Sequence, residues 1–100
     1  LGRTGEALSE YDRAIELRSD YVKPLVNRAI ILAKRGQIDG ALSDLDRALA
    51  ANPDNVPALY HRGRLKMDRG DEAAARRDLE RLLRLTPGDE KAEQLLRRAR

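Results

Sequence analysis

The chain has 100 residues, a formal net charge of +3 and no cysteine, which excludes disulfide bonds and thiol-ligated zinc. Charged residues make up 37% of it, against roughly 25% in an average domain. No window contains the 18 or so consecutive apolar residues that a membrane-spanning helix needs. These features predict a single soluble domain outside the membrane. They leave the compartment undetermined, with the cytoplasm as a working guess.

The first predicted helix runs from Glu6 to Leu17, within a first segment of residues 1–21. Leu8, Tyr11 and Ile15 follow one another at steps of three and four, so a helix places them on one face. We interpret this segment as the second helix of a truncated repeat. Its apolar face is therefore expected to be exposed, or to be covered only by another chain or by the rest of a longer protein.

Residues 22–55 are predicted to form a complete helical hairpin. Leu25, Ala29 and Leu32 make an apolar helical stripe that ends at Gly36, a residue suited to a left-handed C-terminal cap. A second stripe follows between residues 38 and 49, and the sequence Asn-Pro-Asp-Asn at 52–55 then favours a turn. The unit therefore has one helix on each side of Gly36.

The pattern repeats at an offset of 34 residues. The positions that coincide are Gly36 with Gly70, Ala41 with Ala75, Asp44 with Asp78, Leu45 with Leu79 and Pro53 with Pro87. A fixed period of this length is typical of stacked repeats, in which neighbouring units bury their apolar faces jointly. Residues 56–88 are thus a second complete repeat. Residues 89–100 are predicted to form a C-terminal capping helix, with Ala92, Leu95, Leu96 and Ala99 facing inward.

Charges repeat with the helices. Arg28 and Asp44 are 16 residues apart, as are Arg62 and Asp78, so each hairpin carries an arginine on one helix and an aspartate at matching height on the other. We expect them to form ion pairs across the hairpin, with two solvated charges as the alternative. Glu10 occupies the acidic position in the first register, and its partner would precede residue 1.

The whole pattern resembles the tetratricopeptide repeat family. The matching residues are Asn27-Arg28-Ala29, His61-Arg62-Gly63, Gly36, Gly70, Ala41, Ala75, Ala48, Pro53 and Pro87. Departures include leucines in place of the early tryptophan, Lys66 in place of an aromatic residue and Leu82 in place of a small residue, so repeat 56–88 is degenerate. The resemblance implies an all-α, right-handed superhelix of stacked antiparallel helix-turn-helix repeats.

The resemblance also implies a function, because first helices in this family line a concave groove that takes up peptides or helices of partner proteins. We therefore predict a non-catalytic protein-binding scaffold without metal or cofactor. The groove residues would be Lys23, Val26, Asn27, Ile30, Lys34, Pro57, Tyr60, His61, Arg64 and Met67. Their mixture of cations, an amide and apolar surface suits an acidic or carboxylate-bearing partner with a few hydrophobic anchors.

Some family members bind chaperone tails through a carboxylate clamp, which is not supported here. Asn27 matches one clamp asparagine, but Pro57 and His61 stand where a lysine and an arginine are expected. Enzymatic activity is also disfavoured, because His61 is the single histidine and no nucleophile or metal-binding motif is present.

Two other functions remain as alternatives. The chain could self-associate through its terminal helices, with Leu8, Tyr11 and Ile15 at one end and Leu95 and Leu96 at the other. It could instead bind nucleic acid through a basic edge, although interspersed acidic residues and the presence of three tyrosines disfavour this. The basic edge would consist of Arg76, Arg77, Arg81, Arg84, Arg97, Arg98 and Arg100.

Overall fold

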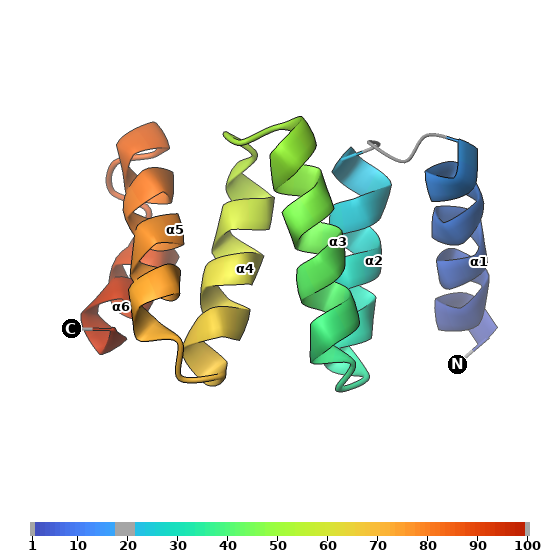
Figure 1. Ribbon diagram of the computed structural model, residues 1–100, viewed down its shortest axis with the longest axis horizontal. Coiled ribbons are helices and arrows are strands. Elements are labelled where there is room, and N and C mark those ends of the chain that lie inside the picture. The colour runs from blue at the N-terminus through green and yellow to red at the C-terminus, as the bar shows by residue number, and fades with distance from the viewer. Residues whose placement is uncertain (1, 18–21, 100) are drawn as a thin grey trace. The chain divides into compact units, whose positions relative to one another are not determined.

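The structure, a computed structural model, describes residues 2–17 and 22–99, which contain six α-helices and no strand (Figure 1). The helices are α1 (Gly2–Leu17), α2 (Val22–Lys34), α3 (Ile38–Ala51), α4 (Val56–Asp68), α5 (Glu72–Leu85) and α6 (Glu90–Arg98). They belong to two compact units, Leu1–Pro53 and Asp54–Arg100.

In the first unit, α2 and α3 form the predicted hairpin, and Gly36 makes the turn between them. Gly36 has a φ of +80°, a conformation that side chains with a Cβ disfavour. The Gln37 N–H donates to the Leu32 carbonyl at 2.8 Å, and the Gly36 N–H donates to the Ala33 carbonyl at 3.0 Å. This is the hydrogen-bond pattern of a Schellman cap. The glycine predicted from the sequence therefore ends α2 by the expected mechanism.

Small and large apolar residues alternate in the core of this hairpin. Leu25 and Ala29 of α2 and Ala41, Leu45 and Ala48 of α3 are all essentially inaccessible to solvent. Alanine at the contact between two helices allows their backbones to approach at the short end of the usual interaxial range. The tight hairpin therefore depends on the small side chain at position 41.

Ala41→Trp should consequently lower the free energy of unfolding by about 1–3 kcal/mol or more, because an indole cannot fit without separating α2 from α3. Urea unfolding followed by far-UV circular dichroism would measure the loss. Ser43→Trp is the matched control, since Ser43 is exposed on the same helix, and it should change stability by no more than about 0.5 kcal/mol. Equal losses for the two variants would contradict the packing of α3.

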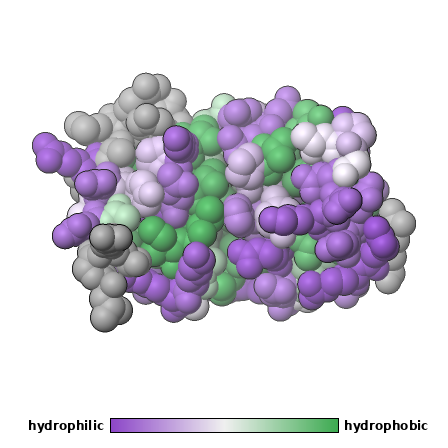
Figure 2. All heavy atoms as spheres, turned by 180° about the vertical axis from the view of Figure 1, so that it is seen from behind, coloured by the Kyte–Doolittle hydropathy of each residue, from purple (hydrophilic) through white to green (hydrophobic). Residues whose placement is uncertain are grey.

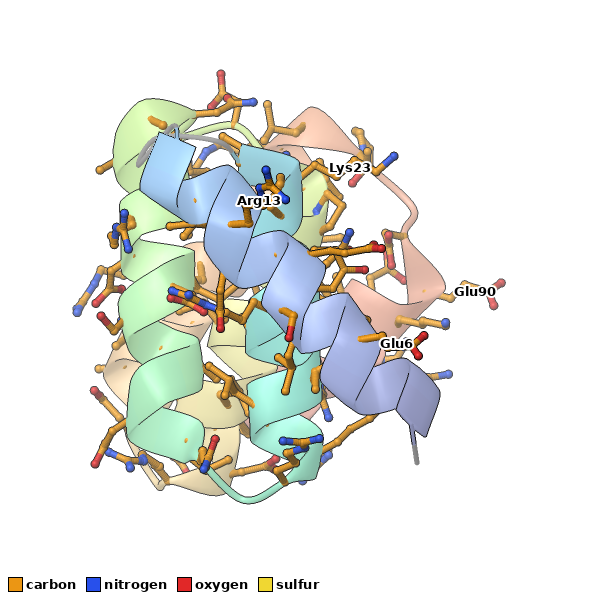
Figure 3. The ribbon with its side chains drawn as sticks, turned by 90° about the vertical axis from the view of Figure 1, so that its right-hand side faces the viewer. Glu6, Arg13, Lys23 and Glu90 are labelled. Atoms are coloured by element: carbon orange, nitrogen blue, oxygen red, sulfur yellow. The ribbon has the colours of Figure 1, made fainter. Side chains whose placement is uncertain are left out.

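The helix α1 corrects two expectations. It begins at Gly2 rather than at Glu6, because residues 2–5 contain no proline, and glycine costs only about 1 kcal/mol in a helix. It also packs against α2 (Figure 3), so Ile15 is only 6% exposed. The prediction that Ile15 lies on an open face was wrong, and self-association through that side chain loses its basis. Leu8 and Tyr11 are half-buried.

The predicted ion pair of the first hairpin is confirmed. The Arg28 Nε and Nη2 atoms donate to the two carboxylate oxygens of Asp44, each at 2.7 Å. Arg28 Nη1 also donates to Asp12 Oδ1 of α1 at 2.9 Å. The pKa of Arg28 is raised above its ordinary value, chiefly by the hydrogen bonds from Asp44 and then by Asp12. One guanidinium thus links α1, α2 and α3.

In the second unit, an Asn or Asp side chain precedes each of the three helices and caps it. Asn55 accepts a hydrogen bond from the Ala58 N–H, Asp71 from the Ala74 N–H, and Asp89 from the Ala92 N–H, at 3.0 to 3.3 Å. Side-chain acceptors at this position satisfy an amide that has no partner within the helix. These caps fix where α4, α5 and α6 begin.

The core of the second unit repeats the arrangement of the first. Arg62 donates to both oxygens of Asp78 at 2.8 and 2.7 Å, which confirms the second predicted ion pair. The predicted inward face of α6 is confirmed as well, because Ala92, Leu95, Leu96 and Ala99 are all buried. Arg76 Nη2 of α5 donates to the Ala99 carbonyl at 2.8 Å. This bond holds the C-terminal end of α6 against α5.

Candidate functional site

A surface hollow of about 330 Å³ lies between α4 and α6 in the second unit. Its lining residues are Tyr60, Arg64, Lys91, Gln94, Leu95 and Arg98. The first two are four residues apart on α4, and the other four recur at steps of three, one and three on α6, so each helix contributes a single face. The helical spacing therefore gathers these six side chains around one space.

The hollow is strongly cationic. Arg64, Lys91 and Arg98 line it and no acidic residue does, and the surface over α6 is mostly hydrophilic (Figure 2, right side). Within residues 2–17 and 22–99, none of these three side chains forms an ion pair with a carboxylate. The Nε atom of Arg64 is buried and lacks a hydrogen-bond acceptor. The site therefore has positive charge that the described part of the protein does not neutralise.

His61 reports this positive potential from the next position on α4. Burial lowers the pKa of its imidazole, and the charges of Arg64 and Lys91 lower it further. Its Nδ1 atom is buried without a hydrogen-bond partner among the described residues. The Tyr60 ring meets the imidazole edge to face, with 5.3 Å between the ring centroids and 79° between their planes. His61 is thus a neutral side chain held beside three cations.

The ten residues predicted to bind a partner are divided between the two units. On α2, Lys23 and Lys34 are exposed, Asn27 and Ile30 are half-buried, and Val26 is 6% exposed. Figure 3 shows Lys23 near the beginning of that helix.

On α4, Pro57 is exposed, Tyr60, His61 and Arg64 are half-buried, and Met67 is 9% exposed. Val26 and Met67 therefore offer little surface to a partner in this structure. Of the predicted set, Tyr60 and Arg64 are the two that line the hollow.

Sequence reasoning missed the contribution of α6, which it treated as a cap. The signal was present in the same offset of 34 residues that defines the repeat. It relates Pro57 to Lys91, Tyr60 to Gln94, His61 to Leu95 and Arg64 to Arg98. The outward face of α6 thus occupies the register of the predicted binding face of α4.

The predicted basic edge is less uniform than its arginines suggest. A hollow of about 370 Å³ is lined by Arg62, Arg77, Asp78, Glu80, Arg81 and Arg84, so acidic side chains are interspersed there. Arg81 donates to Asp54 at 2.6 Å, and Arg76 is used by the Ala99 carbonyl. Arg100 lies outside the described residues. Phosphate binding along this edge would compete with these internal contacts.

A third hollow, of about 260 Å³, lies between α5 and α6 on another side of the same unit. Leu83, Glu93, Leu96 and Arg97 line it. Among the residues whose placement is described, no group of three or more His, Cys, Asp or Glu side chains could hold a metal ion. No helix in the same part of the chain is both long and apolar enough to cross a membrane.

Comparison with family models identifies the chain. Residues 32–99 match the model described as tetratricopeptide repeat. The chain belongs to the tetratricopeptide repeat family. The predicted all-α fold of helical hairpins is therefore confirmed. No curated protein sequence matches the chain.

Solved tetratricopeptide repeat structures superpose closely on it. A tetratricopeptide repeat protein from Parabacteroides merdae ATCC 43184 has a TM-score of 0.90 and 28% identity; the match covers 98% of this chain and 38% of that one. This chain thus spans well under half of that protein's length.

Two peptide-bound repeat domains are also similar. The first domain of Spaghetti (RPAP3), bound to the HSP90 peptide SRMEEVD, has a TM-score of 0.91 and 26% identity over 98% of this chain and 78% of that one. The second domain of human RPAP3, in complex with the HSP70 peptide SGPTIEEVD, has a TM-score of 0.87 and 26% identity over 98% and 82%.

Proposed function

We propose that this tetratricopeptide repeat chain is a non-catalytic binding module that holds a segment of a partner protein on the outward faces of its first helices. In the second unit these faces belong to α4 and α6 and form the cationic hollow. In the first unit the corresponding face belongs to α2 and carries Lys23, Asn27, Ile30 and Lys34.

The observation that carries this proposal is the composition of the hollow. Arg64, Lys91 and Arg98 supply charge without an internal counter-ion, while Tyr60 and Leu95 supply apolar surface. Arginine and tyrosine are enriched among the residues that dominate binding energy at protein interfaces. A segment that combines an acidic group with a hydrophobic anchor would satisfy both kinds of lining.

The structural neighbours support the same class of ligand. Two of them are bound to peptides that contain consecutive glutamates and end in aspartate, according to the printed sequences SRMEEVD and SGPTIEEVD. At 26% identity, the neighbours support a peptide ligand rather than those particular peptides. In this chain His61, not a cationic residue, lies between the α2 and α6 positions of the register, so the recognition chemistry is expected to differ.

Affinity capture with the immobilised chain tests the proposal. The variant Arg64→Gln/Lys91→Gln removes two charges of the hollow, and Arg13→Gln/Arg84→Gln removes two exposed charges elsewhere. A partner protein should be retained by the parent and by the control but reduced at least about tenfold by the first variant, because a lost charged hydrogen bond costs about 1.5–3 kcal/mol.

Equal retention by all three proteins would refute the hollow as the binding site. Nuclease treatment of the captured material distinguishes the alternative ligand. If nuclease abolishes capture and Arg84 rather than Arg64 is required, the basic edge binds nucleic acid and the present proposal fails.

A further inference from the structure

We propose that the hollow between α4 and α6 accepts a phosphate group, carried by a phosphorylated serine or threonine of the partner segment. This inference rests on the proposed function, since it specifies which group of a bound segment enters the hollow. It is argued from the number of charges, the kinds of donors and the size of the space.

The charge count favours a dianion over a single carboxylate. Three cations line the hollow and no acidic residue accompanies them. One carboxylate would neutralise one of the three, whereas a phosphorylated side chain carries about −1.5 to −2 charges near neutral pH. A phosphate group therefore leaves much less of the positive charge uncompensated.

The donors are also of the kind that binds phosphate. Arg64 and Arg98 approach from different helices with planar guanidinium groups, which can each give two parallel hydrogen bonds to phosphate oxygens. Lys91 adds a compact charge, and the Gln94 amide and Tyr60 hydroxyl add neutral donors. The buried Nε atom of Arg64 has no acceptor among the described residues. This is an arginine cluster of the type used in phosphopeptide recognition.

The space fits a phosphorylated side chain rather than an isolated ion. A volume of about 330 Å³ corresponds to roughly ten water molecules at about 30 Å³ each. A phosphate fills only part of it, and the Leu95 side chain can contact the carbon atoms that carry the phosphate. Nucleic acid fits less well, because Tyr60 is the one aromatic residue in the lining, and binding of single strands relies on several stacking platforms.

Titration of the ¹⁵N-labelled chain followed by NMR tests the inference. The probes are N-acetyl-O-phosphoserine amide, inorganic phosphate and acetate, at equal ionic strength and at a pH above the second phosphate pKa of about 6. The phosphorylated probes should perturb amides of α4 and α6 and bind at least about tenfold more tightly than acetate, because charge-assisted bonds to arginine are about twice as strong as neutral ones.

The variants localise the effect. Arg64→Gln and Arg98→Gln should each weaken phosphoserine binding at least about tenfold, while Arg13→Gln, in the other unit, should leave it unchanged. The imidazole of His61 gives an independent readout. Its pKa should rise when phosphate is bound, because the anion offsets the charges of Arg64 and Lys91 that now lower it.

Equal affinity for acetate and phosphoserine, or perturbations insensitive to Arg64→Gln and Arg98→Gln, would overturn the inference. Phosphatase treatment of the captured partner separates this failure from that of the proposed function. Capture that still requires Arg64 and Lys91 after dephosphorylation would retain the binding module and reject the phosphate. Capture lost on dephosphorylation would support it.

Discussion

Asp44→Ala should lower the free energy of unfolding of the first unit by about 3 kcal/mol, the lower end of the range for removing one partner of a buried ion pair. The Asp44 side chain is 4% exposed and that of Arg28 is 20% exposed. Without Asp44, the guanidinium loses two hydrogen bonds of 2.7 Å and keeps Asp12 as its printed partner, which is 55% exposed. The positive charge would then remain partly buried with weak compensation.

Three further variants identify the cause of that loss. Asp12→Ala should cost less than about 1 kcal/mol, because its contact is solvated. Arg28→Met/Asp44→Leu should recover most of the stability, since an apolar pair of similar size leaves no buried charge unpaired. Urea unfolding measures all of them. A double variant as unstable as Asp44→Ala would indicate that the loss comes from packing instead of charge.

Leu79→Ala should cost about 2–5 kcal/mol in the second unit, the range for truncating a buried leucine. The Leu79 side chain is fully inaccessible to solvent and lies against the backbone of α4 at Gly63. A Cβ atom built on Gly63 would be 3.1 Å from both Cγ and Cδ2 of Leu79. Glycine at position 63 therefore makes room for this leucine.

Gly63→Ala provides the test of that contact. In the parent chain it should destabilise, because Leu79 is enclosed and cannot move away from a new methyl group. In the Leu79→Ala chain the same change should stabilise, since the clash is gone and alanine gains about 1 kcal/mol of helix propensity over glycine. Urea unfolding of the four proteins forms a double-mutant cycle. An effect of Gly63→Ala with the same sign in both backgrounds would contradict the close contact.

The sequence predicted those features that depend on neighbouring turns of one hairpin. Gly36 ends α2 because a left-handed cap needs a residue without a Cβ, and this requirement is local. Arg28 and Asp44 meet because two helices joined by a short turn have a fixed register. The same argument placed Arg62 against Asp78, and the apolar spacing of α6 identified its buried face. None of these predictions required knowledge of how separate hairpins pack.

The tertiary structure decided the contacts between elements that no short turn joins. The acid of α1 that reaches Arg28 is Asp12, although Glu10 occupies the expected register, because α1 packs on α2 in a different way from α3. That packing also buries Ile15. The cationic hollow likewise requires α6 to lie beside α4, held by its buried leucines and by Arg76 at its C-terminal end. Periodicity assigns a residue to a helix face, but the packing of a second helix decides whether that face becomes core or a binding surface.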